Sequence, residues 1–183
     1  HGCGVAPGAE PNVEHGGEFH QETGRGAGVL VNDDERGDCG TLEIHSDGSY
    51  ENGYAWRNLG LVSPFYGAFA ECYSGPVEVC ALVLDLTQIG SYFGQPIDIL
   101  VWDDEEGCPG AVRCLRAGVT LESIAYWPSV SRHVIPLDAC CTSDSYWVGC
   151  WQATPFEVAG YFVGADLTGP GGCPKTCIAP GID

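Results

Sequence analysis

The chain of 183 residues has no methionine, a single lysine (Lys175) and no long apolar run. A membrane-spanning helix needs about 20 consecutive apolar residues, and the longest aliphatic run, at residues 79–84, is far shorter. Seven basic residues stand against 25 acidic ones, which gives a net charge of −18. Because phosphate backbones and anionic lipid headgroups bind clustered Lys and Arg, this composition excludes nucleic acid and an anionic membrane surface as partners. The short apolar runs in turn exclude membrane insertion.

Helical periodicity is also scarce, and turn-forming residues are abundant, with 27 Gly and 12 Pro. Short runs rich in β-branched and aromatic residues alternate with Gly, Pro, Asn and Asp. We expect strands at residues 41–45, 50–59, 65–73, 77–86, 97–102, 118–126, 130–137, 146–152 and 156–165, and a further strand from 176. This spacing predicts an all-β fold, a two-sheet antiparallel β-sandwich (jelly roll).

The composition changes near residue 40. Residues 1–40 are rich in glycine and carry one aromatic residue, Phe19, so this segment has too little apolar mass to build its own core. It contains one β-like run, Val29-Leu30-Val31, which is followed by a turn-forming stretch at 32–37. We therefore predict an extended N-terminal arm at 1–40 and a jelly-roll β-sandwich domain at 41–183.

Eleven cysteines are many for this length. The sequence starts His1-Gly2-Cys3, without an initiator methionine, and we interpret it as a processed, secreted protein that folds in an oxidising compartment. Turn-forming residues separate three cysteine pairs, and a fourth bridge would join neighbouring strands. The spacing predicts the disulfides Cys72–Cys80, Cys108–Cys114, Cys173–Cys177 and a bond from Cys150 to Cys140 or Cys141.

An odd number of cysteines leaves at least one thiol free or bonded to another molecule. Cys3, in the arm, is our candidate for a bond between molecules. The alternative is a Cys3–Cys39 bridge, with Cys140 or Cys141 left reduced and buried. Zinc binding by thiolates is a weaker interpretation, because the sequence lacks the paired Cys-x₂-Cys or His knuckles of zinc sites.

One acidic run follows a predicted buried strand. Asp103, Asp104 and Glu106 form a solvated turn in the simplest interpretation. They are also candidate ligands for calcium, which takes six to eight oxygens, or an acid–base pair for glycoside hydrolysis. Because no nucleophile elbow or phosphate-binding loop is present, we predict that the protein is not an enzyme and needs no cofactor apart from this candidate calcium ion.

The aromatic residues suggest two further alternatives. By strand alternation, Trp147 and Trp151 share one face and Tyr146, Val148 and Cys150 share the other. Tyr50, Tyr54 and Trp56 also share a face. Exposed rows of this kind would form a sugar-stacking platform, whereas buried rows would form half of a sandwich core, which is the more common arrangement.

Several motifs in order along the chain carry a resemblance to known domains. Residues 47–56 read DGSYENGYAW and are followed by GAFAE at 67–71, VWDD at 101–104, CPG at 108–110, GYFVGAD at 160–166 and IAPGI at 178–182. This series resembles poorly characterised jelly-roll-like β-sandwich domains of secreted bacterial proteins, over residues 45–183. Similar domains occur as subunits of extracellular fibrils, joined head to tail by an N-terminal strand, which implies the same assembly here.

Our leading hypothesis is therefore a structural subunit of an extracellular filament, a homopolymer in which the arm is a donor strand for the next subunit. We expect Val29 and Val31 to fill pockets of the acceptor core and Leu30 to lie on its outer face. Val13, Phe19 or a Cys3 cross-link would strengthen the joint. The alternative is a carbohydrate-binding or adhesive module of a larger secreted protein, with glycans as partners and the arm as a linker.

Overall fold

A computed structural model of the chain describes residues 24–32, 40–54, 66–90, 94, 96–142, 144–152, 161–173 and 175–179. These residues form thirteen strands and no helix. The strands are β1 (Gly24–Arg25), β2 (Ala27–Asn32), β3 (Thr41–Glu43), β4 (Asn52–Tyr54), β5 (Tyr66–Tyr73), β6 (Glu78–Gln88), β7 (Ile97–Glu105), β8 (Cys108–Val119), β9 (Ala125–Tyr126), β10 (Ser131–Cys141), β11 (Tyr146–Gln152), β12 (Phe162–Asp166) and β13 (Lys175–Ala179).

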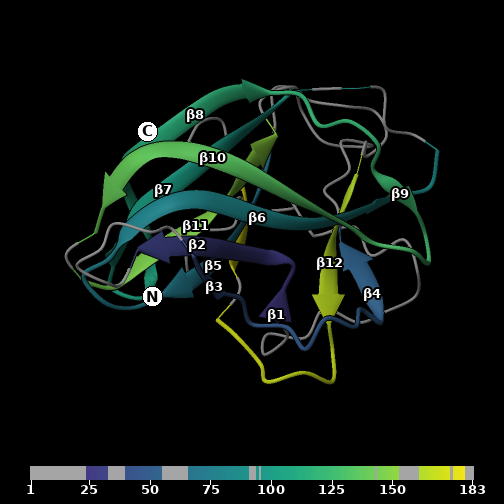
Figure 1. Cartoon of the computed structure of the whole chain (residues 1–183), viewed down its shortest axis with the longest axis horizontal. Helices are drawn as coiled ribbons and strands as arrows, with labels where there is room; N and C mark the ends of the chain where they lie inside the picture. Colours follow the sequence, from purple (N-terminus) through teal and green to yellow (C-terminus); the bar gives the residue numbers. More distant parts are fainter. Residues whose placement is uncertain are drawn as a thin grey trace.

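The strands form two sheets (Figure 1). The eight-stranded sheet has the order β1-β12-β6-β2-β3, with β10 and β9 also paired to β6 and β4 paired to β12. The five-stranded sheet has the order β13-β5-β11-β7-β8. All pairings are antiparallel except the short one between β6 and β9. The predicted all-β, two-sheet sandwich is therefore confirmed.

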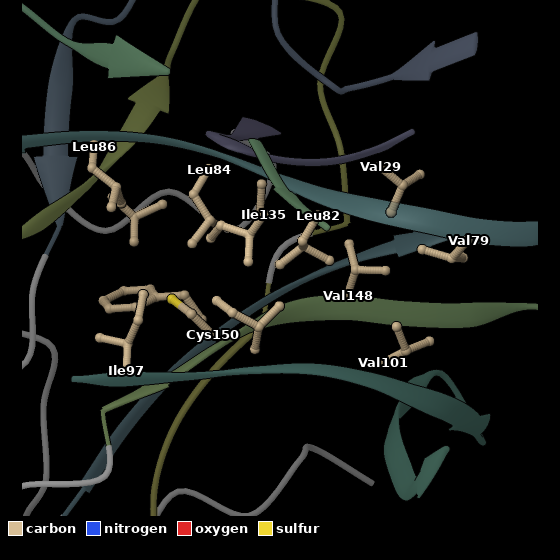
Figure 2. Close-up of a cluster of buried hydrophobic side chains, with 14 of the residues drawn as sticks. Val29, Val79, Leu82, Leu84, Leu86, Ile97, Val101, Ile135, Val148 and Cys150 are labelled. Atoms are coloured by element: carbon tan, nitrogen blue, oxygen red, sulfur yellow. The ribbon is translucent and has the colours of Figure 1, made fainter. Parts of the chain in front are cut away.

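The core lies between the sheets. Figure 2 shows Leu82, Leu84 and Leu86 of β6 pointing across the interface toward Ile97 and other side chains of the five-stranded sheet. Along β6 the register skips one residue at Cys80, so that side chains on both sides of the skip face inward. Burial of this apolar surface is the main force that holds the two sheets together.

A second apolar cluster covers the other face of the five-stranded sheet. It consists of Ala68, Ala70, Leu100, Trp102, Trp147 and Trp151. The predicted alternation along 146–152 is confirmed, because Trp147 and Trp151 lie in this cluster while Tyr146, Val148 and Cys150 lie in the main core. Both tryptophans are buried, so they form a core rather than an exposed sugar platform.

The prediction of a strand at 118–126 is wrong, because the chain forms β8 earlier, over Cys108–Val119. The error lies at the turn that precedes β8. Glu106 and Gly107 have φ angles of 56° and 79° and form a two-residue hairpin loop between the paired residues Glu105 and Cys108. Positive φ at both loop residues matches the right-handed twist of the flanking strands. Pro109 and Gly110, which we expected in a loop, therefore lie within the strand.

This turn generates a stability prediction. Glu106 is not a glycine but adopts the left-handed conformation, which costs most side chains about 1–2 kcal/mol. Asn tolerates this conformation better, so Glu106→Asn should raise the free energy of unfolding by about 0.5–1 kcal/mol. Thermal denaturation followed by circular dichroism measures this. Glu105→Asn, a change of the same chemistry in the adjoining strand residue, is the control and should not stabilise the protein.

Candidate functional site

The most unusual feature of the sandwich is how its N-terminal strand is seated. β12 pairs with β6 only through Phe162–Thr87 and Val163–Leu86. Beyond these residues the two strands separate, and β1 takes over as the partner of β12 while β2 pairs with β6 from Leu84 to Glu78. Figure 1 shows β12 crossing the end of β6, with β1 and β2 in the corner between them. Residues 24–32 thus fill a slot between β6 and β12, which we call the corner slot.

Gly26 lies at the bend between β1 and β2. Its N–H donates to the Gly164 carbonyl of β12 at 2.8 Å, and its carbonyl accepts from the Asp85 N–H of β6 at 2.6 Å. One residue therefore connects both walls of the slot. A Cβ at this position would lie 2.6 Å from the Asp85 carbonyl oxygen, so only glycine fits without a shift of the backbone.

The strand also contributes to the main core. Val29 and Val31 are 0% exposed, and Ala27 is buried beside them. The Tyr73 hydroxyl, from the opposite sheet, donates to the Ala27 carbonyl at 2.8 Å. Burial of two valines contributes about 3–6 kcal/mol, so the core is incomplete without this strand.

The structure therefore places the predicted joint residues in the chain's own sandwich. Val29 and Val31 face the core, and Leu30 is half-buried on the other face, opposite Ala81 of β6. The composition break at residue 40 is thus no boundary of the sandwich within a single chain, because residues 24–32 supply core side chains despite their low aromatic content. The other predicted joint residues, Val13, Phe19 and Cys3, lie outside the described residues.

The predicted cysteine pairing is wrong. The bonds are Cys72–Cys173, with Cα atoms 5.6 Å apart, and Cys114–Cys140, with Cα atoms 6.2 Å apart. Cys80 and Cys108 are also disulfide-bonded, but neither can be bonded to the partner that we expected, since Cys72 and Cys114 are taken.

The reasons lie in the strand arrangement. Cys72 and Cys80 are on β5 and β6, which belong to different sheets, so the residues between them connect two layers and do not form a hairpin. Cys108 and Cys114 lie on the same strand, β8. Six residues of extended chain span about 20 Å, far beyond the Cα separation of about 6 Å that a disulfide allows.

Two cysteines of the described part of the chain are free, the exposed Cys141 and the buried Cys150. Cys150 was predicted to be bonded, and this prediction is wrong. Burial raises the pKa of the Cys150 thiol to about 11, so the thiolate is scarce at neutral pH. The side chain of Cys177 lies outside the described residues.

The acidic turn does not bring its three carboxylates together. Asp103 pairs with the Arg113 guanidinium at 2.5 Å. Asp104 accepts hydrogen bonds from the Trp147 indole N–H at 2.7 Å and from the Gly107 N–H at 3.2 Å. Successive residues of β7 point to opposite faces of the sheet, and Glu106 lies in the hairpin loop. Each aspartate therefore serves local structure, and the candidate calcium ligands do not converge.

A different group of potential ligands meets beside β5. The Nδ1 atom of His45 lies 3.2 Å from Oε1 of the fully buried Glu71, and the Cys173 N–H donates to the same oxygen at 2.5 Å. His45 also stacks on the Tyr73 ring. The ligand atoms of His45, Glu71 and Cys173 lie within 4.8 Å of one another, but the Cys173 sulfur is bonded to Cys72 and offers no thiolate. The group is therefore a pair formed by a buried carboxylate and a partly exposed imidazole, which lies beside a disulfide.

A second buried carboxylate, Asp85, lies on the outer face of the eight-stranded sheet and forms a two-pronged pair with Arg132. The guanidinium Nε and Nη2 atoms lie 2.8 and 2.6 Å from the two carboxylate oxygens. Sequence reasoning missed this pair. A single acidic residue inside the apolar run of β6 was the signal that could have found it, since a carboxylate there needs a partner.

Comparison with known proteins gives no family for this chain. No protein-family model matches it, and no curated protein or solved structure matches it either. In the described residues, no helix is long and apolar enough to cross a membrane. Functional inference therefore depends on the geometry of the chain itself.

The corner slot generates a prediction about Gly26. Gly26→Ala should lower the free energy of unfolding by about 1–3 kcal/mol, because the added methyl group overpacks against the Asp85 backbone. Urea denaturation measures the change. Gly40→Ala is the matched control, since a Cβ added at that position would lie in open space. An equal effect of both variants would show that the bend does not need glycine.

The two free thiols generate a second prediction. At about pH 8, iodoacetamide should modify Cys141 and leave Cys150 intact until the protein unfolds, because only the thiolate reacts. Mass spectrometry of the native and the denatured protein distinguishes the two sites. The Cys141→Ser variant should lose the fast modification. Equal modification rates for both thiols in the native protein would contradict the buried position of Cys150.

Proposed function

We propose that the protein is a structural subunit of an extracellular filament, in which residues 24–32 of one copy occupy the corner slot of the next. The observation that carries this proposal is the seating of the N-terminal strand. It fills a slot between two strands from distant parts of the sequence, and it supplies buried valines to a core that is otherwise built by residues after position 40.

Strand exchange would use the contacts that already exist. The pairing of β2 with β6 and the burial of Val29 and Val31 would be the same whether the strand comes from the same chain or from a neighbour. The two arrangements therefore differ mainly in the entropy of the connection and in protein concentration. The connection between β2 and β3, residues 33–40, is the segment that would pass from one subunit to the next.

The symmetry of such a joint favours a filament. A donor strand and an acceptor slot are different surfaces of the molecule, so the contact is heterologous and generates an open chain unless the rotation closes a ring. The disulfides support an extracellular location, because such bonds form and persist in oxidising compartments. We include in the same proposal that the sandwich has a jelly-roll topology and that the protein is secreted.

Leu30 and Ala81 provide a direct test. They face each other across β2 and β6, outside the main core, so a cysteine pair there does not disturb core packing. We would co-express a Leu30→Cys chain and an Ala81→Cys chain with different tags, both in a Cys141→Ser background. Exchange predicts a disulfide between the two differently tagged chains, because the strand of one lies in the slot of the other.

Non-reducing electrophoresis and peptide mass mapping read the result. The double variant Leu30→Cys, Ala81→Cys is the control, since it forms the bond within one chain in a monomer and between chains in a filament. A linked monomer from the double variant, without any link between the co-expressed single variants, would contradict strand exchange. Negative-stain microscopy of the unmodified protein should show filaments.

A further inference from the structure

A surface pocket of about 450 Å³ lies on the outer face of the eight-stranded sheet. Its lining residues are Gly48, Tyr50, Asp85, Pro128, Val130 and Arg132. Asp85 comes from β6, where it alternates with the core residues Leu84 and Leu86, so its side chain faces away from the core. The remaining walls come from residues before β4, from the connection between β9 and β10, and from Arg132 of β10.

The floor of the pocket is an ion pair with unequal exposure. The Asp85 side chain is 3% exposed, whereas that of Arg132 is 42% exposed. Both carboxylate oxygens accept from the Arg132 guanidinium, and the Tyr50 hydroxyl donates to Oδ2. Burial of the Tyr50 ring, and then its bond to Asp85, raise the pKa of this hydroxyl, so it stays a donor. The three side chains therefore hold one another in fixed positions.

The pair leaves hydrogen-bonding capacity for a ligand. Nε and Nη2 of Arg132 contact Asp85, whereas Nη1 makes no hydrogen bond to this carboxylate. A carboxylate has about four lone-pair positions, and Asp85 uses three of them. A fixed donor and a fixed acceptor thus lie side by side, next to the apolar surfaces of Pro128 and Val130.

The charges decide which ligand fits. Asp85 and Arg132 cancel each other, so the pocket has no net charge to attract an ion, and the overall charge of −18 repels anions. Adjacent hydroxyl groups match a neighbouring donor and acceptor, and the C–H face of a sugar ring matches Pro128 and Val130. The volume lies within the range of about 300–1,000 Å³ that is typical of small-molecule sites.

We propose that this pocket binds one residue of a neutral saccharide, held by Arg132 and Asp85 with Tyr50 as the positioning residue. The proposal does not rest on filament formation, because the pocket lies on the outer face of a single sandwich. It gives the protein a glycan-binding site in addition to its structural role.

The test uses the full-length protein and named sugars. Methyl glucoside, methyl galactoside, methyl mannoside and N-acetylglucosamine are titrated while the Arg132 Nε–H and Tyr50 resonances are followed by NMR. At least one of them should shift these signals with a Kd on the order of 1 mM, and glucuronate should not. If none of the neutral sugars shifts either signal, or if glucuronate binds as well as they do, the proposal is overturned.

Two variants separate binding from folding. Arg132→Lys keeps the charge but loses the planar fork, so it should weaken binding about tenfold or more. Arg116→Lys, at an exposed arginine of β8, is the matched control and should leave binding unchanged. If Arg132→Lys does not fold, Val130→Trp decides, because it fills the pocket while both charges of the ion pair remain, and it should abolish binding. Full binding by a folded Arg132→Lys or Val130→Trp variant would overturn the proposal.

Discussion

The whole architecture depends on which strands form backbone hydrogen bonds with the two edges of β6. One edge pairs with β10 along most of its length, but the other is shared between β12 and β2, which meet it at different points. A buried strand with a free edge would leave several backbone N–H and C=O groups unpaired, and each such group costs about 1–3 kcal/mol. The bend at Gly26 removes this cost. The segment before the bend pairs with β12 and the segment after it pairs with β6, while Gly26 itself bonds to both strands.

The disulfides complement this arrangement by joining elements that the sequence keeps apart. Cys72–Cys173 closes a loop of 101 residues, and Cys114–Cys140 joins the five-stranded sheet to the eight-stranded one. In the chain-entropy model a loop of about 100 residues gives roughly 4.7 kcal/mol, more than the short loops that we expected would give. The bonds thus stabilise the sandwich as a whole and not its individual turns.

Local pattern predicted the strands well and their partners poorly. The strand at 146–152 has the predicted bounds because the alternation of Trp147 and Trp151 with core residues continues over its whole length. β8 was missed because Pro109 and Gly110 are typical of turns, whereas the hairpin loop depends on the backbone of Glu106 and Gly107. Cysteine partners and the corner slot depend on which strands share a sheet, and a single sequence carries no information on that.

Asp85 connects the two proposals physically. Its backbone N–H bonds to the Gly26 carbonyl in the corner slot, while its side chain forms the floor of the pocket with Arg132 and Tyr50. The ring of Tyr50 packs against Gly164, whose carbonyl accepts the Gly26 N–H. An occupied slot therefore fixes the backbone beneath the pocket, whichever chain supplies the strand. In the proposed filament, the strand of one subunit would support the floor of its neighbour's pocket from below, although residues 24–32 do not line that pocket.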